Sequence, residues 1–394
     1  MNPFHFEFTT PQKIVFGWGK ISELPNLAEP LGQSPLVVFN GKSPDRALEL
    51  LKAANLRYTL HRQRGEPTVS DVGSALQIAK QNQCDMVIAI GGGSAIDCGK
   101  AVAGLLTNDG AVLDYLEVIG KGRKITKPPA PWIAIPTTAG TGSEATRNAV
   151  IGSPEHKYKA SLRSEHLLAK VALIDPQLGI DVPPNVRAAS GMDALVQCIE
   201  SFTSCGANEM TKPLSLQGIS LAVSALPIIS WAGLPVREGW ASQTARDSMA
   251  MAALASGIAL NNAGLGAVHG LAASLGANTT APHGVICGVL LPHVLRANIA
   301  ALLADRNPAF MLYKQVGQRL SSTPAMETEE AIDACPIIAA DLVQKLQLPS
   351  LAQFGLTESM FPQIIEMAKK SSSMRYNPVP LADDVLANIL RASL

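Results

Sequence analysis

The fold is decided by a stretch that reads MVIAIGGGSAID, from Met86 to Asp97, and by a second of the same design that reads WIAIPTTAGTGSE, from Trp132 to Glu144. Each begins as a short apolar run and ends in glycines and hydroxyl side chains. Such runs are typical of parallel strands that are covered on both faces. Glycines at the carboxyl end of a strand let backbone N–H groups approach a phosphate at the start of the next helix. Together the stretches predict a nucleotide site, although either alone could be only a tight turn.

Strand-like and helical segments alternate through the first part of the chain. The strand-like runs are Pro35–Phe39, Met86–Ile90, Trp132–Ile135 and Val171–Ile174, and helical spacing is found at Asp45–Asn55 and Val69–Gln83. This alternation predicts a parallel sheet, whose ligands bind at the carboxyl ends of the strands. After Pro183 the strand signals stop and helical patterns continue to Leu394. We therefore expect an α/β dinucleotide-binding domain over residues 1–182 and an all-helical domain over residues 183–394.

Composition and charge exclude several classes of function. A chain of 394 residues with 47% hydrophobic and 16% charged residues is long and apolar enough to form two well-buried domains. Lys and Arg together number 32, as do Asp and Glu, so no basic excess is present to neutralise nucleic acid or an anionic membrane surface. We expect neither as a partner.

The cysteines and the apolar segments favour a cytoplasmic protein. The 6 cysteines are scattered without a C-x-x-C pair, which is typical of reduced thiols rather than disulfides or a zinc ribbon. The first residues contain no basic segment followed by an apolar one, so no secretion signal is predicted. The longest apolar segment, Ile219–Val236, is interrupted by Pro227 and several serines, which favours a buried core helix over a membrane span.

The two glycine-rich stretches, read as G-G-G-S-x-x-D and P-T-T-A-G-T-G-S-E, differ from the G-x-G-x-x-G and P-loop motifs. They closely resemble those of the iron-containing (group III) alcohol dehydrogenases. The resemblance spans nearly the whole chain, and its further matches are Lys13–Gly17, Ala172–Pro176, Gly191–Leu195, Pro282–Gly284 and Asn377-Pro378. It implies an α/β nucleotide-binding domain, an all-helical domain and a divalent metal in the cleft between them, in a fold that dehydroquinate synthase also has. It also suggests a homodimer.

Several residues of the first domain are candidates for binding the dinucleotide. From the residues themselves, we expect the pyrophosphate to be bound by Gly91, Gly92, Gly93 and Ser94. The resemblance implies that Asp97 faces the cofactor, although a carboxylate in a first helical turn is also favoured by the helix dipole alone. It further implies that the nicotinamide and its ribose are lined by Thr137, Thr138 and Thr141, and that the ribose is contacted by Lys159. Without the resemblance, Lys159 would be read as a surface lysine.

The turn after Pro35–Phe39 bears on the choice between NAD and NADP. An acidic residue there would bind the ribose hydroxyls of NAD and repel a 2′-phosphate. The place holds Gly41, which is followed by Lys42 and Ser43 and then by Arg46. Positive charge and hydroxyl donors suit a phosphate, so the sequence favours NADP, with NAD as the alternative. A solvated turn before a helix explains the same residues.

The metal site implied by the resemblance is incomplete in this chain. The family places an aspartate and a histidine one helical turn apart and adds two later histidines. Asp193, His269 and His283 match three of these places, but the fourth holds Gln197, whose carbonyl is a poorer transition-metal ligand than imidazole. We expect iron or zinc at these four residues. A further family histidine, one turn after His269, is replaced by Ala273, so proton exchange must use a hydroxyl, solvent or the cofactor ribose.

The predicted function is NAD(P)-dependent hydride transfer between a small alcohol and its aldehyde or ketone, with Asp193, His269 and His283 as the catalytic residues. Three alternatives stay open. One is a maleylacetate-type reductase, and another is a lyase of the same fold that uses the nucleotide only transiently. The third is a nucleotide-binding protein with a degenerate metal site.

Overall fold

The computed structural model describes residues 5–156, 158–230 and 240–394, and it divides into two compact units. The first unit consists of Thr9–Thr138 and Gly142–Val182. The second consists of Pro183–Leu394, the short piece Ala139–Thr141 and the first residues that the structure describes. The hydroxyl-rich stretch that follows Trp132–Pro136 is therefore shared between the two units.

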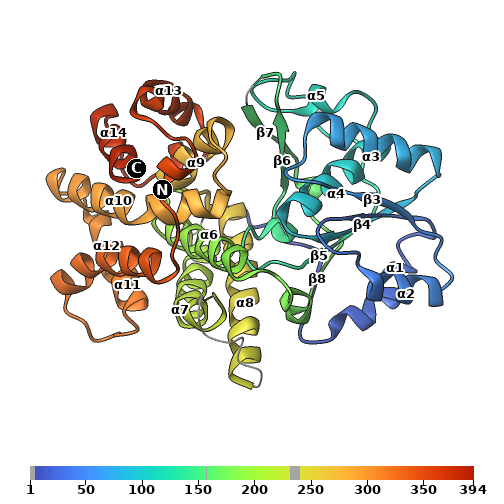
Figure 1. Cartoon of the computed structure of the whole chain (residues 1–394), viewed down its shortest axis with the longest axis horizontal. Helices are drawn as coiled ribbons and strands as arrows, with labels where there is room; N and C mark the ends of the chain where they lie inside the picture. Colours follow the sequence, from blue (N-terminus) through green and yellow to red (C-terminus); the bar gives the residue numbers. More distant parts are fainter. Residues whose placement is uncertain (1–4, 157, 231–239) are drawn as a thin grey trace. The chain divides into compact units, whose positions relative to one another are not determined.

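The first unit is built on a six-stranded parallel sheet with the strand order β1-β8-β5-β4-β2-β3 (Figure 1). Its strands are β1 (Lys13–Phe16), β2 (Pro35–Phe39), β3 (Thr59–Arg62), β4 (Met86–Gly91), β5 (Trp132–Pro136) and β8 (Val171–Ile174). Every residue of β2, β4 and β8 is buried, as expected for strands covered on both faces. The predicted α/β domain with a parallel sheet is confirmed.

Helices cover both faces of this sheet (Figure 1). They are α1 (Leu24–Ala28), α2 (Asp45–Ala53), α3 (Val69–Gln81), α4 (Gly93–Thr107) and α5 (Val112–Tyr115), with 3₁₀ turns η1 (Lys20–Glu23), η2 (Ser143–Ala145), η3 (Glu165–Leu167) and η4 (Pro176–Gly179). Successive strand residues point to opposite faces. Val87 and Ala89 accordingly pack with α3 and α4, while Ile88 and Ile90 pack with α1 and α2.

An antiparallel hairpin, which the sequence did not predict, adds a second sheet to the first unit. It pairs β6 (Asn148–Ser153) with β7 (Tyr158–Arg163). Its strands bury only some of their residues, with Ala149 and Ile151 on the buried face and Val150 exposed. A strand with one solvent-exposed face has a less continuous hydrophobic pattern in the sequence than the fully buried strands of the main sheet.

The described part of the second unit is helical throughout, as predicted. Its helices are α6 (Pro184–Thr203), α7 (Thr211–Ser230), α8 (Trp240–Ala263), α9 (Ala267–Asn278), α10 (His283–Ala304), α11 (Leu312–Leu320), α12 (Thr328–Lys345), α13 (Phe361–Lys370) and α14 (Asp383–Ala392). Four 3₁₀ turns join them: η5 (Pro308–Met311), η6 (Leu351–Phe354), η7 (Glu358–Met360) and η8 (Met374–Tyr376). Helix α10 packs against α6, α9, α12 and α14, and so lies at the centre of the helical core.

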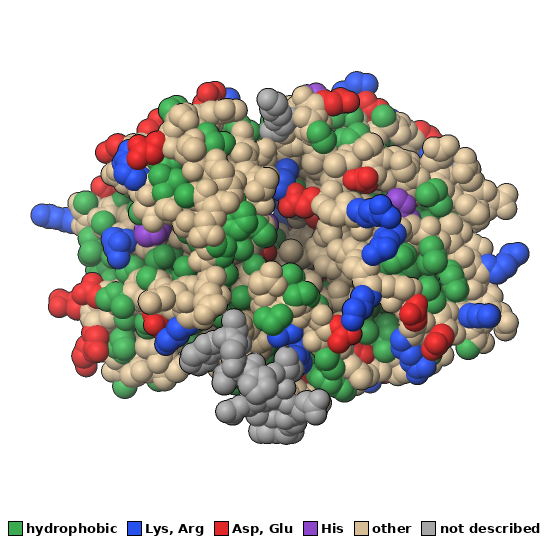
Figure 2. Space-filling model, viewed as in Figure 1, with side chains coloured by type: hydrophobic (Ala, Val, Ile, Leu, Met, Phe, Trp, Pro, Cys, Tyr) green, Lys and Arg blue, Asp and Glu red, His purple; other side chains and the backbone are tan. Residues whose placement is uncertain are grey.

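Two of the described helices, α7 and α10, are long and apolar enough to cross a membrane, and α8 with α9 would qualify as one bent pair. In this structure 72% of the most apolar window of α10 and 44% of that of α7 is buried within the protein. Of the segment Ile219–Val236, for which we expected a core helix, residues 219–230 belong to α7 and the rest lies outside the described residues. The face drawn in Figure 2 carries interspersed acidic and basic side chains, in keeping with the balanced charge.

Candidate active site

The glycine-rich turn after β4 is shaped by Asn40, which directly follows β2. The Asn40 side chain accepts a hydrogen bond from the Gly92 amide at 3.1 Å and donates one to the Ser94 hydroxyl at 2.7 Å. Gly91 has φ +152°, and a Cβ there would lie 2.1 Å from the Asn40 oxygen, so only glycine fits. Helix α4 begins at Gly93, and its first amides have no acceptor within the helix. The predicted cradle Gly91–Ser94 is thus a helix N-terminus suited to an anion.

A buried lysine, Lys100, holds the predicted cofactor residue Asp97 in place. The Lys100 side chain is fully buried, and its Nζ donates to the Ser143 carbonyl at 2.8 Å, the Thr146 hydroxyl at 2.9 Å and the Asn148 carbonyl at 2.7 Å. Asp97 lies 3.4 Å from the same ammonium, accepts from the Ser143 hydroxyl and accepts from the Val150 amide at 3.0 Å. Asp97 therefore joins α4 to the chain around η2 and β6.

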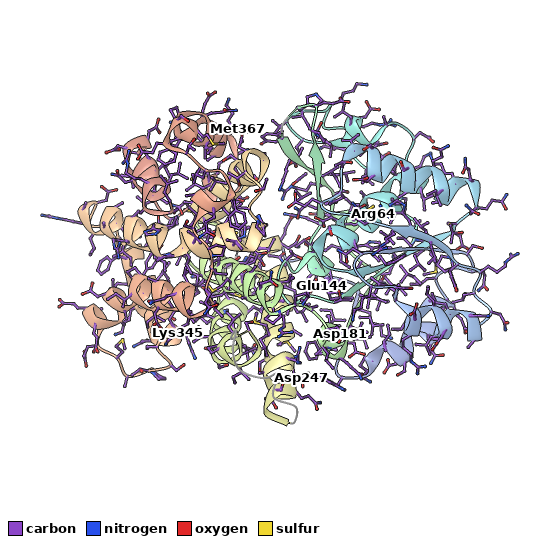
Figure 3. All side chains as sticks on the ribbon, viewed as in Figure 1. Arg64, Glu144, Asp181, Asp247, Lys345 and Met367 are labelled. Carbon is purple, nitrogen blue, oxygen red and sulfur yellow. The ribbon has the colours of Figure 1, made fainter. Side chains whose placement is uncertain are left out.

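Burial shifts the pKa values of two charged groups in this region. It lowers the pKa of the Lys100 ammonium, which the nearby Asp97 partly opposes. It raises the pKa of the Glu144 carboxyl, labelled in Figure 3, to about 7. A lysine buried with this many acceptors is a structural anchor. Its hydrogen bonds set the position of the chain that follows the hydroxyl-rich stretch.

The predicted threonines and Lys159 lie in different surroundings. Thr137 donates its amide to the Gly91 carbonyl at 2.9 Å, and Thr138 lies beside Gly92. Thr141 belongs to the second unit, where its carbonyl accepts from the Gln197 amide at 3.4 Å. Lys159 is 19% exposed and pairs with Glu66, so it is not a free surface lysine.

The turn after β2 gains a positive charge from the neighbouring strand. Gly41 has φ +72°, and its carbonyl accepts a hydrogen bond from the exposed Arg62 guanidinium at 2.9 Å. Lys42 pairs at 3.1 Å with Asp181, which is labelled in Figure 3, and both side chains are largely exposed. Ser43 is exposed. The sequence analysis did not predict that a residue of β3 would contact this turn. Arg62 was therefore missed as a candidate cofactor residue.

In the second unit the structure brings Asp193, His269 and His283 together and adds Cys287. These residues come from α6, α9 and α10, and one potential ligand atom of each lies within 4.8 Å of the others. The Asp193 carboxylate oxygen is 3.2 Å from Nε2 of His269 and 3.7 Å from Nε2 of His283. The Cys287 sulfur is 3.7 Å from Nε2 of His269 and 3.6 Å from Nε2 of His283. We call these four residues the α6–α9–α10 cluster.

A buried carboxylate outside the cluster, Glu200, orients one of its histidines. Glu200 lies 2.6 Å from Nδ1 of His269 and accepts from the Val268 amide at 2.6 Å. When Nδ1 carries the proton to this carboxylate, the Nε2 lone pair points at Asp193 and Cys287. A carboxylate that fixes a histidine in this way is the usual outer partner of a metal-binding imidazole.

Charges within the cluster shift the pKa values of its members. Burial alone would raise the pKa of Asp193, but the positive charges of His283 and His269 outweigh it and lower the pKa. Burial would lower the pKa of His269, but negative charge at Cys287 and the hydrogen bonds to Asp193 and Glu200 raise it well above the usual value. Negative charge at Cys287, followed by that of Asp193, raises the pKa of His283 to about 9. Without a cation the cluster therefore retains protons on its imidazoles.

The amide of Gln197, predicted as the fourth ligand, is engaged elsewhere. Gln197 lies one turn after Asp193 on the same face of α6. Its carbonyl oxygen accepts from the Ser256 hydroxyl at 2.7 Å, and its nitrogen donates to the Thr141 carbonyl at 3.4 Å. Both ends of the side chain have neutral partners.

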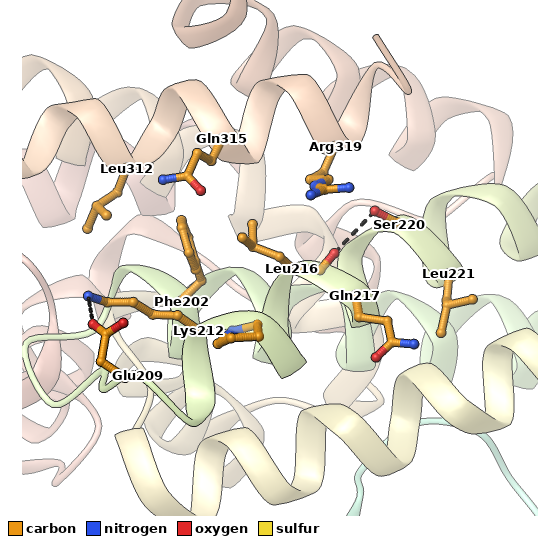
Figure 4. A pocket seen from close by; sticks show the side chains of 11 residues that line it. Phe202, Glu209, Lys212, Leu216, Gln217, Ser220, Leu221, Leu312, Gln315 and Arg319 are labelled. Carbon is orange, nitrogen blue, oxygen red and sulfur yellow. Dashed lines mark hydrogen bonds and ion pairs between the residues drawn. The ribbon is translucent and has the colours of Figure 1, made fainter. Parts of the chain in front are cut away.

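A separate cavity of about 570 Å³ lies in the helical unit, where α7 meets α11 (Figure 4). Its charged lining residues are Glu209, Lys212 and Arg319, and Glu209 and Lys212 form an ion pair at 3.4 Å. None of the predicted cofactor or metal residues lines it. We therefore treat the two glycine-rich stretches and the α6–α9–α10 cluster as the candidate active-site regions.

Comparison with known proteins shows the family to which the chain belongs. Residues 11–176 match the model of the iron-containing alcohol dehydrogenase family, and residues 187–394 match the model of its C-terminal domain. The chain belongs to the iron-containing alcohol dehydrogenase family. This alcohol dehydrogenase is 32% identical over 400 residues to 1,3-propanediol dehydrogenase of Klebsiella pneumoniae, covering 98% of each chain.

Solved structures agree with the family over the whole length of the chain. A crystal structure of a 1,3-propanediol oxidoreductase superposes with a TM-score of 0.89 at 31% identity, over 99% of this chain and 100% of the other. Sulfoacetaldehyde reductase from Bifidobacterium kashiwanohense, in complex with NAD⁺, gives 0.84 at 27% identity, over 99% of both chains. The predicted oxidoreductase class is confirmed, together with the family's use of a nicotinamide cofactor and a divalent metal.

Sequence reasoning missed five residues that shape these regions. They are Asn40, Arg62, Lys100, Glu200 and Cys287. For two of them a signal was available, because Glu200 continues the helical face of Asp193 and Cys287 lies one turn after His283. The other three act through contacts between elements far apart in the chain.

The glycine cradle yields a direct prediction for Gly92→Val. Gly92 has φ −75°, which any residue adopts, and the nearest atom to an added Cβ is 3.4 Å away, so the fold should survive. The larger side chain should occupy the phosphate space and weaken nucleotide binding about tenfold or more, a loss of about 1.4 kcal/mol. Calorimetric titration with NADPH and NADH measures this effect. Gly73→Val, in an open position of α3, is the matched control, and equal affinity in the two variants would refute the cradle.

Proposed function

We propose that this alcohol dehydrogenase interconverts a small alcohol and its aldehyde or ketone with NADP(H), assisted by a divalent cation at the α6–α9–α10 cluster. The convergence of Asp193, His269 and His283 from three helices is the observation that supports the proposal most directly. Asp193 and His269 are 2% and 7% exposed, and burying ionisable groups this deeply is costly without a compensating charge.

The residues of the cluster fit a divalent cation. They offer one carboxylate oxygen and two imidazole nitrogens, the donor types that iron and zinc accept. Glu200 fixes the orientation of His269, so that its Nε2 faces Asp193 and Cys287. When bound, a cation of this kind stabilises an alkoxide in oxidation and polarises a carbonyl in reduction.

The protein's own part in the reaction is to bind and position the reactants. The α4 N-terminus at the Gly91–Ser94 turn would bind the pyrophosphate, while Thr138 borders the same turn. Asp193, His269 and His283 would hold the cation, and Glu200 would keep the proton on Nδ1 of His269 throughout. Ala273 cannot exchange protons, so the substrate proton must leave by a hydroxyl, solvent or the cofactor ribose.

Three features support NADP over NAD. Gly41 offers no carboxylate to repel a 2′-phosphate, Arg62 brings positive charge to the same turn, and Lys42 lies beside it in an ion pair with Asp181. A guanidinium that binds a backbone carbonyl with one nitrogen has further N–H donors for a phosphate. The complex of sulfoacetaldehyde reductase with NAD⁺ shows that the fold also accommodates NAD, so the local charge has to decide.

Substitution of Gly41 tests the cofactor preference. Gly41→Asp should bind ribose hydroxyls and repel the 2′-phosphate, shifting the ratio of kcat/KM values toward NAD about tenfold, or about 1.4 kcal/mol. The backbone at Gly41 has φ +72°, and nothing lies within 4 Å of an added Cβ, so an aspartate fits at a modest conformational cost. Gly41→Asn carries the same cost without the charge and is the control. A wild-type protein that prefers NAD would contradict our interpretation of this turn.

One set of assays tests the reaction class and its alternatives. We expect oxidation of NADPH, and more slowly of NADH, in the presence of small aldehydes, with loss of activity on chelation and recovery on adding zinc or ferrous iron. Turnover confined to unsaturated dicarboxylates would favour a maleylacetate-type reductase. Chemistry without net consumption of the nucleotide would favour a lyase, and binding without any turnover would favour a degenerate site.

Metal binding should strengthen with pH. The pKa of His283 is raised to about 9 by negative charge at Cys287 and by Asp193, and an imidazole must lose its proton before it can bind a metal. The apparent affinity for zinc should therefore rise from about pH 6 to about pH 9, by about tenfold per pH unit for each proton displaced. Competition titration with a chelator of known affinity measures it. His283→Ala should weaken zinc binding and its pH dependence but leave NADPH binding nearly intact, and a flat pH profile in the wild-type protein would contradict this assignment.

A cytoplasmic homodimer that acts on small molecules, without nucleic-acid or membrane partners, completes the proposal. The balanced charge of 32 basic and 32 acidic residues supports the absence of nucleic-acid and membrane partners, and the scattered cysteines support the location, whereas the homodimer rests on the family resemblance. Sedimentation of the purified protein would determine the oligomeric state.

A further inference from the structure

Cys287 occupies the place that a fourth metal ligand would need. It lies on α10, one turn after His283, and its side chain is fully buried. Its sulfur lies 3.6 Å from Nε2 of His283 and 3.7 Å from Nε2 of His269. Both nitrogens are also the atoms of these imidazoles that approach Asp193. The thiol therefore faces the same point as the three residues already assigned to the cation.

The distances agree with the edges of a coordination tetrahedron. Metal–nitrogen bonds of about 2.0–2.1 Å and a metal–sulfur bond of about 2.3 Å give edges of about 3.3 Å between nitrogen or oxygen donors and about 3.6 Å between nitrogen and sulfur. The corresponding distances are 3.2 and 3.7 Å from the Asp193 oxygen to the two imidazoles, and 3.6 and 3.7 Å from the Cys287 sulfur to the same nitrogens. Four of the six edges therefore match those of a tetrahedral site, and the other two lie within the 4.8 Å that encloses all four ligand atoms.

Gln197 is hydrogen-bonded to other residues, so the position of the fourth ligand is open to Cys287. The glutamine carbonyl, the only atom of that side chain able to bind a cation, already accepts a hydrogen bond from Ser256 at 2.7 Å. A neutral amide is also a weaker ligand for zinc or iron than a thiolate. The position at which relatives are expected to have a histidine is thus filled by a residue with neutral partners, while a better donor approaches from α10.

Other buried cysteines of the chain have different neighbours. Cys198 lies 3.9 Å from the Ala252 carbonyl, and Cys335 donates to the Tyr313 carbonyl at 3.1 Å. Burial raises the pKa of Cys335 to about 12, as expected for an inert thiol in a core. Among the cysteines for which the structure gives side-chain contacts, Cys287 is the one whose sulfur faces two imidazoles and a carboxylate.

We propose that the cation is bound by Asp193, His269, His283 and the Cys287 thiolate, so that a sulfur ligand from α10 replaces the missing histidine of α6. The thiol loses its proton to solvent as the ion binds, and no oxidation is involved. This inference rests on the proposed function, because it assumes that the cluster binds a metal. A thiolate in place of an imidazole makes the site softer, which favours zinc over ferrous iron.

Cobalt substitution tests the proposal by a readout other than activity. The metal-free full-length protein is titrated with Co²⁺, and the near-ultraviolet absorption is recorded. A thiolate ligand gives a sulfur-to-cobalt charge-transfer band that grows to one equivalent, whereas oxygen and nitrogen ligands give none. Cobalt binding without this band would overturn the role of Cys287 and leave the proposed function standing. Failure to bind cobalt or zinc at all would overturn both.

Two variants and a control assign the band to its residue. Cys287→Ser should abolish the band and weaken zinc binding about 10–100-fold or more, since loss of a ligand should cost at least as much as loss of an outer partner. Adding Gln197→His to Cys287→Ser should restore affinity but not the band, because a histidine then completes the set from α6. Cys205→Ser, at an exposed cysteine, should change neither. A band that persists in Cys287→Ser would overturn the proposal, and circular dichroism checks that each variant is folded.

Discussion

Two buried carboxylates on one face of α6 impose a strong electrostatic constraint on the helical unit. Asp193 is 2% exposed and Glu200 is 5% exposed, so neither is screened by water. Buried charge of this kind is tolerated only when opposite charge and hydrogen bonds compensate it. The chain supplies His269 between the two carboxylates and His283 beside the first. The arrangement of α9 and α10 around α6 can be understood as the packing that brings these partners to Asp193 and Glu200.

The same constraint explains why the cluster suits a cation. Without one, the pKa values of both histidines are raised, so the imidazoles stay protonated to balance Asp193 and any negative charge at Cys287. A divalent ion can replace those protons and balance the same charge. A metal bound at the cluster would therefore compete with protons, and the donor atoms of the cluster would determine which metal competes best.

The α/β unit is organised by a different constraint, which is the close approach of the Asn40 side chain to the backbone at the end of β4. Gly91 must lack a side chain because Asn40 lies against it, and Asn40 in turn positions Gly92 and Ser94. Lys100 ties the following helix to the chain after β5 through a set of buried hydrogen bonds. The Gly91–Ser94 turn is consequently held by its own hydrogen bonds, which would lower the entropic cost of binding an anion there.

The amino-acid sequence by itself determined β2, β4, β5 and β8 of the main sheet, although not β1 or β3, and also the helical character of the second half, the family and three members of the cluster. These follow from local features: buried apolar runs that end in glycines, helical spacing, and motifs in a fixed order. The hairpin of β6 and β7 was missed because its strands are short and have one exposed face. Their mixture of apolar and polar residues does not form a recognisable hydrophobic run. Only the tertiary structure brought Cys287 to His269, Glu200 to Nδ1 of His269 and Arg62 to Gly41. Each of these contacts joins separate elements, and their distances depend on how helices and strands pack rather than on any spacing along the chain.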